Sequence, residues 1–474
     1  MLSLNEAIKH REIFSFFEEI SHIPRGSGHT TAIAAYLVEF AKARGLYVYR
    51  DAHDNVLIRK AATAGYEGHT PVILQGHTDI VAVKTPDSEK DMEREGLELY
   101  VDGDFLRAKD TSLGADDGIA IAYALAILDS NDVAHPPLEA LFTSDEEIGL
   151  IGAGGFDTSK LAGATLINID SDGEGVFTVG CAGGVRCDLT LPMQLAASAG
   201  LAYRLSVGGL VGGHSGVEIN RGRANALRVL GSCLASVAGV RLVSLAGGVA
   251  DNAIATDAQA TFVAEGDVKA QIKAAVRALR ARYAETDPAM VVSVEAIGSV
   301  DRAYTHEDSA KAISLFTELP NGVIAMSEAI PTLVETSLNV GIATLSDEGL
   351  SLCISVRSSK EADKDMLTDK LATFVRAFGG DMSMRGAYPA WEYRENSPLR
   401  EAACRVFARM YGKKAECMVI HAGLECGVFA GKIQNFDSIS LGPDNYDLHT
   451  TEEHMSISSA VRVYEFLREL LAAL

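Results

Sequence analysis

Apolar residues recur along the first third of the chain in two alternating patterns. Short apolar runs at 72–74, 138–142 and 165–169, the first bounded by Pro71 and Gly76, predict buried strands. Residues 30–44 have the spacing of an amphipathic helix, and 119–128 is apolar on most faces, which predicts a buried helix. Strands that alternate with helices are typical of an α/β sheet.

The middle of the chain has a different pattern, with more strands and fewer intervening helices. We expect strands at 203–207, 241–245, 258–264, 291–296 and 352–356, and helices near 224–238, 267–285 and 361–378. The α/β pattern then returns, with helices at 398–411 and 456–472 and strands at 418–420 and 438–441. The predicted fold class is α/β with two domains: a catalytic domain formed by 1–190 and 386–474, and an inserted α+β domain at 191–385.

Composition and charge narrow the class of protein. The 474 residues are 47% apolar and 22% charged, a balance typical of a globular protein with a large core. A formal net charge of -22 disfavours binding to nucleic acid or to a membrane surface. The seven cysteines are scattered without a C-x-x-C pair, which argues against a disulfide framework. The first twenty residues have no secretory pattern, so we expect a cytoplasmic protein.

Histidines and carboxylates follow several of the predicted strands. In a parallel α/β sheet, ligands gather outside the carboxyl ends of the strands, so side chains far apart in sequence can converge there. Imidazoles and carboxylates without thiolates suit zinc, manganese or cobalt ions. The candidate ligands and their neighbours are His77, Asp79, Asp116, Glu146, Glu147, Asp170 and His449.

Each of these candidates also has a purely structural interpretation. His77 and Asp79 can form a structural pair at a strand end, and Asp116 precedes a helix, where aspartate is favoured as a cap. Glu146 and Glu147 can form a solvated acidic turn. Asp170 can begin a turn, and His449, like His454, can be a surface histidine. Only the joint occurrence of these residues indicates a site.

Six ordered motifs together resemble the aminoacylase/carboxypeptidase G-like family of two-zinc peptidases. The likeness is greatest to its aminoacyl-histidine (Xaa-His or carnosine-type) dipeptidases, and it extends over nearly the whole chain. The motifs are Gln75-Gly76-His77-Thr78-Asp79, Leu113-Gly114-Ala115-Asp116-Asp117-Gly118, Asp145-Glu146-Glu147-Ile148-Gly149, Asn168-Ile169-Asp170-Ser171, Gly212-Gly213-His214-Ser215-Gly216 and Ala422-Gly423-Leu424-Glu425-Cys426-Gly427.

The resemblance implies a zinc-peptidase-type catalytic domain, a lid or dimerisation domain, and two Zn²⁺ ions per subunit, with Mn²⁺ or Co²⁺ as alternatives. One ion would be held by His77, Asp116 and Asp170, and the second by Asp116, Glu147 and His449. Asp79 would orient His77, and Glu146 would be the general base. Adjacent side chains diverge in an extended loop, so we expect only one of the two glutamates to reach the ions. Local geometry does not say which, and the resemblance assigns Glu147 as the ligand.

The inserted domain supplies the other residues that the resemblance implies. His214 would reach the active site of the other subunit of a homodimer and stabilise the oxyanion. Asn252, Arg357 and Gly423 would hold the substrate's backbone and carboxylate. Without the resemblance, each of these four residues is better explained as an ordinary turn, strand-end or surface position.

The loop after His449 departs from the family pattern. Relatives usually have Ser-Pro-Asp-Glu after this histidine, whereas this chain has Thr450-Thr451-Glu452-Glu453, so His454 competes with His449 as the ligand. Asp117 stands where close relatives often have Asn.

The function implied by the resemblance is metal-dependent hydrolysis of dipeptides with a free C-terminus, with Xaa-His or broad specificity. The alternatives are an N-acyl amino-acid amidohydrolase or a tripeptidase with the same two-metal site, and a noncatalytic binding protein of the same fold. The chain has no G-x-x-x-x-G-K-[ST], H-E-x-x-H or G-x-S-x-G motif, which disfavours nucleotide, helical-zinc and serine-hydrolase chemistry.

Overall fold

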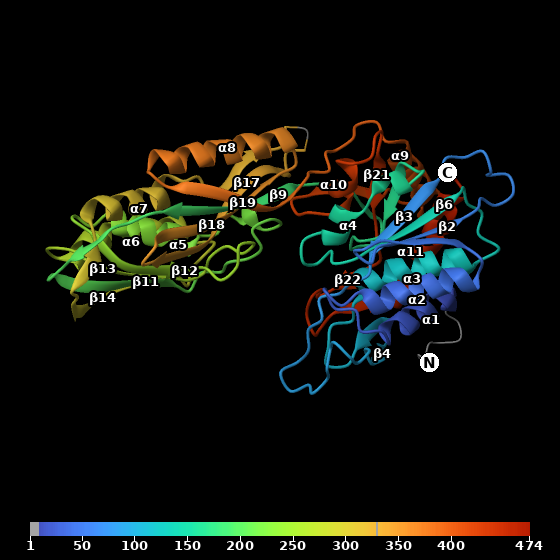
Figure 1. Ribbon diagram of the computed structural model, residues 1–474, viewed down its shortest axis with the longest axis horizontal. Helices are drawn as coiled ribbons and strands as arrows, with labels where there is room; N and C mark the ends of the chain where they lie inside the picture. The colour runs from blue at the N-terminus through green and yellow to red at the C-terminus, as the bar shows by residue number, and fades with distance from the viewer. Residues whose placement is uncertain (1–8, 329) are drawn as a thin grey trace. The chain divides into compact units, whose positions relative to one another are not determined.

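The structure is a computed structural model that describes residues 9–328 and 330–474 (Figure 1). The chain divides into two compact units, of which unit 1 comprises 1–181, 391–419 and 424–474, and unit 2 comprises 182–390 and 420–423. The expected domain boundaries at 190/191 and 385/386 fall inside two strands of unit 2, β9 (Gly183–Leu191) and β19 (Asp381–Tyr388).

Unit 1 is an α/β unit assembled from three separate segments of the chain. Its helices are α1 (Arg11–Ser21), α2 (Thr31–Ala43), α3 (Ala115–Asp129), α4 (Ile151–Gly155), α9 (Pro398–Tyr411), α10 (Glu425–Ala430) and α11 (Ile457–Leu471), with a 3₁₀ turn at Thr158–Lys160. Its strands are β1 (Tyr47–Arg50), β2 (Val56–Lys60), β3 (Val72–His77), β4 (Leu99–Asp102), β5 (Phe105–Ala108), β6 (Leu138–Thr143), β7 (Thr165–Asn168), β8 (Val176–Cys181), β20 (Glu416–Ile420), β21 (Asp437–Ser440), β22 (Asn445–Tyr446) and β23 (His454–Ser456).

The main sheet of unit 1 has a parallel centre. Among the described residues its order is β1-β2-β6-β3-β7-β21-β8-β20. Strands β6, β3, β7 and β21 are parallel neighbours, while the pairs β1–β2, β2–β6 and β21–β8 are antiparallel. β3, β6 and β21 are buried along their whole length, as central strands covered on both faces are. The carboxyl ends of the parallel strands therefore meet at one edge of the sheet.

The predicted elements of this unit are confirmed. The strands at 72–74, 138–142 and 165–169 correspond to β3, β6 and β7, and the helix at 119–128 is the buried α3. Figure 1 shows α1, α2 and α3 side by side on one face of the sheet, and the contacts of α3 with α1 and with β3 agree. The antiparallel outer strands were not predicted, because β1 and β2 are short and only partly apolar.

A small second sheet positions the loop that contains His449. In the described chain its order is β22-β23-β5-β4, and all of its pairs are antiparallel. β22 and β23 pair through Tyr446 and His454 and enclose the loop 447–453 between them. The loop is thus held at both ends.

Unit 2 is an α+β unit, as predicted for the middle of the chain. Its further strands are β10 (Leu195–Ala197), β11 (Leu201–Gly208), β12 (Arg241–Gly247), β13 (Ala258–Val263), β14 (Val291–Ser299), β15 (Arg302–Tyr304), β16 (Gly322–Met326), β17 (Val334–Ser346) and β18 (Gly349–Ser358). Its helices are α5 (Ala226–Ala235), α6 (Val268–Arg282), α7 (His306–Glu318) and α8 (Glu361–Ala377), with a 3₁₀ turn at Ile219–Arg221.

The large sheet of unit 2 is antiparallel in every pair recorded for the described residues, in the order β14-β11-β13-β12-β17-β18-β9-β19, with β16 beside β17. A single core cluster joins residues of α5, α7 and α8 to the sheet, whereas β14 and β19 at its edges are mostly exposed. No helix in the described chain is long and apolar enough to cross a membrane.

Candidate metal centre

His77 lies at the carboxyl end of β3, among carboxylates from other elements. Its side chain is 1% exposed. The imidazole Nε2 lies 2.9 Å from Asp116 Oδ1 and 3.9 Å from Asp170 Oδ1. Nδ1 lies 3.1 Å from the backbone oxygen of Asp79, which fixes the orientation of the ring. His77, Asp116 and Asp170 form a group whose ligand atoms all lie within 4.8 Å of one another.

Asp116, near the start of α3, belongs to two such groups. Its second oxygen, Oδ2, lies 3.1 Å from Nε2 of His449. The same imidazole nitrogen lies 2.8 Å from Oε1 of Glu147, so Asp116, Glu147 and His449 form another group. The Asp116 carboxylate therefore faces one imidazole with each oxygen. The peptide bond between Asp116 and Asp117 is cis.

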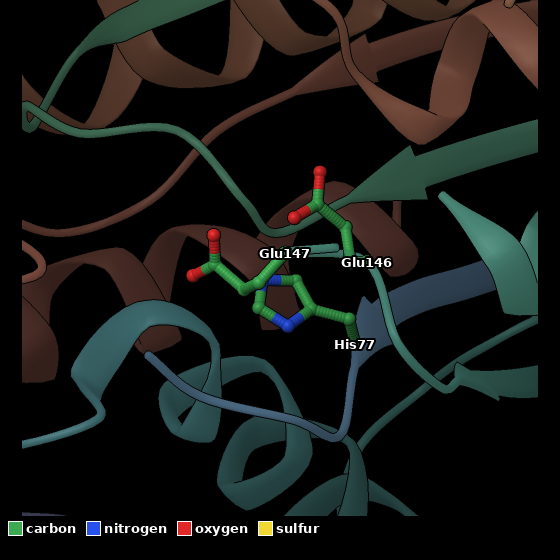
Figure 2. Close-up of side chains that lie close together, drawn as sticks. All are labelled: His77, Glu146 and Glu147. Carbon is green, nitrogen blue, oxygen red and sulfur yellow. The ribbon is translucent and has the colours of Figure 1, made fainter. Parts of the chain in front are cut away.

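Both glutamates of the loop after β6 reach His77, and these three side chains form a further group (Figure 2). The expectation that only one of the two points at the site is wrong. It assumed an extended loop, but Asp145 has a φ of 52°, which turns the backbone just before the glutamates.

Asp79 holds the glutamate loop against β3. The carboxylate is fully buried and accepts hydrogen bonds from the backbone nitrogens of Glu146 (3.0 Å) and Glu147 (3.2 Å) and from the hydroxyl of Ser27 (2.7 Å). Burial opposes its ionisation, but the neighbouring His77 and these hydrogen bonds lower the pKa of Asp79 to about 2. Asp79 therefore connects the strand end that carries His77 to the loop that carries both glutamates.

The cluster is electrostatically crowded. Burial, followed by the neighbouring carboxylates, raises the pKa of Glu146 and Asp170 well above the usual value, although the charge of His77 partly opposes this. Hydrogen bonds with Asp116 and Glu147 raise the pKa of His449 to about 10. So many buried carboxylates repel one another unless positive charge lies between them.

These residues fit divalent metal ions. Oδ2 of Asp170 is buried and has no hydrogen-bond partner among the described residues, a costly arrangement unless a ligand meets it. The three groups contain only imidazole nitrogens and carboxylate oxygens, which suit zinc, manganese or cobalt.

His454, the competitor of His449, lies elsewhere. Its ring packs against Tyr446 and Phe105, with centroids 5.0 and 4.9 Å apart, and its Nδ1 lies 2.8 Å from the backbone oxygen of Glu452. It belongs to none of the metal-binding groups found in the described part of the chain, whereas His449 does.

Two buried charged residues that the sequence did not single out support the start of α3. Arg25, only 1% exposed, donates to the backbone oxygens of Thr78 (3.0 Å) and Gly114 (2.8 Å). Glu453 accepts from the backbone nitrogens of Leu113 (2.9 Å), Gly114 (3.0 Å) and Ala115 (2.9 Å). Glu453 thus connects the His449 loop to the turn before Asp116. More than 330 residues separate these partners, so no local pattern could have revealed the contact.

Asp117 supports the backbone of His77 through a hydrogen bond. Its Oδ2 accepts from the backbone nitrogen of His77 at 3.1 Å. The approach is so close that a Cβ at Gly76 would collide with this carboxylate and with the methyl group of Ala120. The glycine of the first motif is therefore required for packing between β3 and α3.

A third missed residue, Glu425 at the start of α10, links β3 and β6 directly and β7 through Gln75. Its Oε2 accepts from Gln75 Nε2 of β3 (2.5 Å) and from the hydroxyl of Thr143 of β6 (2.7 Å). Gln75 Oε1 accepts from Asn168 Nδ2 of β7 at 2.7 Å. Glu425 is fully buried, and burial is the main cause that raises its pKa to about 7. The sequence offered a signal, because Gln75, Thr143 and Asn168 are polar residues at the ends of apolar strands.

The predicted substrate residues lie in unit 2, where they are close to one another. Nδ1 of His214 accepts from the backbone nitrogens of Gly216 (3.2 Å) and Val217 (3.3 Å), which leaves Nε2 to carry the proton of the neutral ring. Burial, followed by the charge of Arg357, lowers the pKa of His214. The backbone oxygen of Asn252 accepts from Ser215 at 2.8 Å, which places Asn252 beside the His214 turn.

Arg357 and Gly423 meet at one aromatic ring. Nη1 of Arg357 donates to the hydroxyl of Tyr388 at 2.7 Å, and a Cβ at Gly423 would collide with the ring of the same tyrosine. Arg357 is 8% exposed, and its Nε has no hydrogen-bond partner among the described residues. Arg357 is therefore a buried cation with donor capacity to spare, and not the strand-end surface charge of the structural interpretation.

A mixed sheet whose parallel strands end in clustered imidazoles and carboxylates, without thiolates, defines a metallohydrolase of the α/β class. The chain belongs to peptidase family M20/M25/M40, whose family model matches residues 73–473. This confirms the resemblance drawn from the six sequence motifs.

Relatives of this chain cover nearly its whole length. The cytosol non-specific dipeptidase of Escherichia coli K12 is 37% identical over 470 residues, which are 97% of this chain and 96% of the relative. The crystal structure of aminoacylhistidine dipeptidase from Vibrio alginolyticus matches with a TM-score of 0.90 and 34% identity, over 99% of this chain and 97% of that one. Aminopeptidase PepT from Bacillus cereus shares the fold, with a TM-score of 0.57 at 14% identity over 98% and 99% of the two chains.

Proposed function

We propose that this protein is a metal-dependent dipeptidase that hydrolyses dipeptides with a free C-terminal carboxylate, of the Xaa-His type or with broad specificity. The observation that carries the proposal is the pair of ligand groups that share Asp116. The dipeptidase names of the E. coli and Vibrio relatives, each above 30% identity over nearly the full chain, support the substrate class.

The cofactor of the proposed reaction is two Zn²⁺ ions, with Mn²⁺ or Co²⁺ able to replace them. His77, Asp116 and Asp170 would hold one ion, and Asp116, Glu147 and His449 the other. When bound, such ions polarise the scissile carbonyl and make water a competent nucleophile near neutral pH. The mixed nitrogen and oxygen donors support zinc without excluding manganese or cobalt.

Glu146 is the proposed general base and acid. Its carboxylate lies beside His77 and is free to take a proton from the attacking water and to deliver it to the leaving amine. Burial raises its pKa, which favours the protonated form, whereas adjacent cations favour the carboxylate. We propose Glu147 as the ligand because it also contacts His449. Asp79 keeps both glutamates in place through their backbone nitrogens.

The residues of unit 2 would bind the substrate. A neutral His214 whose proton is on Nε2 is a hydrogen-bond donor suited to a developing oxyanion. Arg357 would pair with the free α-carboxylate, which selects short substrates with an open C-terminus. Asn252 and Gly423 would contact the backbone of the substrate. In a homodimer, as the family resemblance implies, His214 would act on the active site of the other subunit.

A dipeptide panel with chelator controls tests the proposal. Purified protein is incubated with β-Ala-His, Leu-His, Gly-Gly and an acetylated amino acid, before and after verified metal removal and after zinc is restored. The expected result is hydrolysis of dipeptides that is lost with the metal and regained with zinc. Undiminished activity in the stripped protein would contradict the proposal. Cleavage of only the acetylated amino acid would favour an amidohydrolase, and inactivity toward all four would favour a tripeptidase or a binding protein.

Location and assembly complete the proposal. We place the protein in the cytoplasm, which the name of the cytosolic E. coli relative supports. Light scattering coupled to gel filtration tests the homodimer, and a mass of one chain, 50.3 kDa, would contradict it.

A further inference from the structure

Two cysteines in unit 1 lie close together near the surface, away from the family motifs. Cys404 is in the middle of α9 and Cys417 is the second residue of β20, the edge strand of the main sheet. Their Sγ atoms are 3.7 Å apart. Cys404 is half-buried and Cys417 is exposed. Neither belongs to a metal-binding group found among the described residues.

The other cysteines differ in both location and reactivity. They are all buried: Cys181, Cys187, Cys233, Cys353 and Cys426. Burial raises the pKa of Cys181 and Cys233 to about 11 and that of Cys353 to about 12, so these thiols are protonated and inert. Of the seven thiols, only the two of the pair are within reach of a reagent in solvent.

The two cysteines of the pair differ in the direction in which their pKa values are shifted. The two sulfurs form a hydrogen bond in which either thiol can be the donor, and Arg400, one turn earlier on α9, adds positive charge. Together they lower the pKa of Cys404 to about 7 despite partial burial. The same contact raises the pKa of Cys417. These opposite shifts favour Cys404 as the thiolate of the pair and Cys417 as the thiol that remains protonated.

We propose that Cys404 and Cys417 form a redox modification site, at which a hydroperoxide converts the two thiols into an intramolecular disulfide between α9 and β20. The sulfurs need to approach by about 1.7 Å to reach the bond length of a disulfide.

The chemistry balances in two steps. The Cys404 thiolate attacks one oxygen of the hydroperoxide, the O–O bond breaks, and the leaving oxygen takes a proton to become water or an alcohol, which leaves a sulfenic acid on Cys404. Cys417 then attacks the Cys404 sulfur as its thiolate, the S–O bond breaks, and water leaves with the proton that Cys417 gives up. Two thiols are oxidised and one peroxide is reduced, and a thiol reductant reverses the product.

The disulfide would restrain β20, the strand in which the chain leaves unit 1 and enters unit 2. The last residue of β20, Ile420, begins the segment 420–423, which belongs to unit 2, and the chain returns to unit 1 at Leu424. Gly423, proposed above to contact substrate, lies in this short segment. The disulfide would join β20 to α9 near the first residue of the strand, while β20 is hydrogen-bonded to β8.

The test is peptide mapping of the full-length protein. Native protein is treated with hydrogen peroxide, its free thiols are alkylated, and it is digested without reductant. We expect a peptide pair joined through Cys404 and Cys417, a monomer on a non-reducing gel, and loss of the cross-link with dithiothreitol. Oxidation at other sites while Cys404 and Cys417 are both still alkylated would overturn the proposal, as would a disulfide between two chains.

Single substitutions separate the two roles. In Cys417→Ser the resolving thiol is gone but a hydrogen-bond donor remains, so peroxide should leave a sulfenic acid on Cys404 that dimedone traps. Cys404→Ser should leave Cys417 unmodified. Cys353→Ser, at a buried thiol, is the matched control and should still form the cross-link. A dimedone adduct on Cys417 but not on Cys404 would contradict the assignment.

The pH dependence of alkylation tests whether the Cys404 and Cys417 sulfurs interact. In the wild type, Cys404 should be alkylated at a rate that rises through pH about 7, and Cys417→Ala should move this midpoint upward while Cys417→Ser moves it less. A wild-type midpoint at pH about 8.5, the value of an isolated thiol, would show that the two sulfurs do not interact and would overturn the proposal.

Discussion

The two carboxylate oxygens of Asp116 each lie next to a different imidazole, and the candidate site depends on this single side chain. Oδ1 faces His77 and Oδ2 faces His449, and these two residues are 372 positions apart in the sequence. Burial opposes the charge of Asp116, but the hydrogen bonds from His449 and His77 lower its pKa. An ionised carboxylate shared by two ligand groups is the arrangement expected of a residue that bridges two cations.

Glu146→Gln separates catalysis from metal binding. Gln retains the shape and hydrogen bonding of the side chain but cannot accept the proton of the attacking water, so turnover should fall by about 10²–10⁴-fold. Glu147→Gln, the matched control one residue away, should instead weaken metal binding. We would measure the steady-state kinetics and the metal content of both variants and compare them. Loss of metal from Glu146→Gln, or retention of its full activity, would reverse or reject the assignment.

Metal uptake should release protons. Without metal, His449 has a pKa of about 10 and the pKa of His77 is raised, because neighbouring carboxylates outweigh the burial of the ring, so both imidazoles are protonated at pH 7. A metal ion binds only the neutral ring, so each imidazole gives up one proton. Low pH therefore opposes metal binding. For each proton displaced, the metal affinity should fall about tenfold for each unit by which the pH is lowered.

Calorimetric titration of metal-free protein with zinc, in two buffers of different ionisation enthalpy, counts these protons. A heat that is independent of the buffer would mean that no proton leaves, and would contradict the protonated state of the cluster.

At the scale of secondary structure, the candidate site forms where the ends of neighbouring strands meet. No single motif is enough to form it. His77 is the last residue of β3, Glu146 and Glu147 follow the end of β6 by three and four residues, and Asp170 follows the end of β7 by two. Each of these strands also contributes a polar side chain to the Glu425 network. Because the strands are parallel neighbours, the hydrogen bonds from Gln75 and Thr143 to one carboxylate fix their relative register. The precision of the ligand positions thus depends on a buried polar network beneath them.

Glu425→Ala and Glu425→Gln test this network. The alanine variant leaves the donors of Gln75 and Thr143 short of an acceptor, which should cost about 2–4 kcal/mol of unfolding free energy and should weaken metal binding. The glutamine variant keeps an oxygen for both donors and should stay close to the wild type. Denaturant unfolding of the metal-free proteins and zinc titration give the two readouts. Equal damage in both variants would mean that the charge of Glu425, and not its hydrogen bonds, is what matters.

At the scale of the whole molecule, the sequence predicted the elements better than their arrangement. The apolar runs at 72–74 and 138–142 located strands that the structure confirms, because buried parallel strands are apolar on both faces. Their order in the sheet was not predictable, since β21 reaches its place beside β7 only after the chain has built all of unit 2.

The side chains that group together at the candidate site could be selected from the sequence, whereas the residues that support them could not. His77 and Asp170 follow apolar strands, so spacing and family resemblance were enough to select them. Arg25, Glu453 and Glu425 act through contacts with backbone groups or side chains of distant segments, and no local pattern distinguishes such residues from surface charges. The turn at Asp145 was missed because nothing around it indicates a left-handed residue.

We propose that folding brings these distant side chains together around two cations. Anomalous diffraction at the zinc edge, from crystals of the zinc-loaded protein, tests it most directly. We expect two peaks, one bounded by His77, Asp116 and Asp170 and the other by Asp116, Glu147 and His449. A zinc-replete crystal that shows no peak at Asp116, with the metal bound elsewhere, would contradict it.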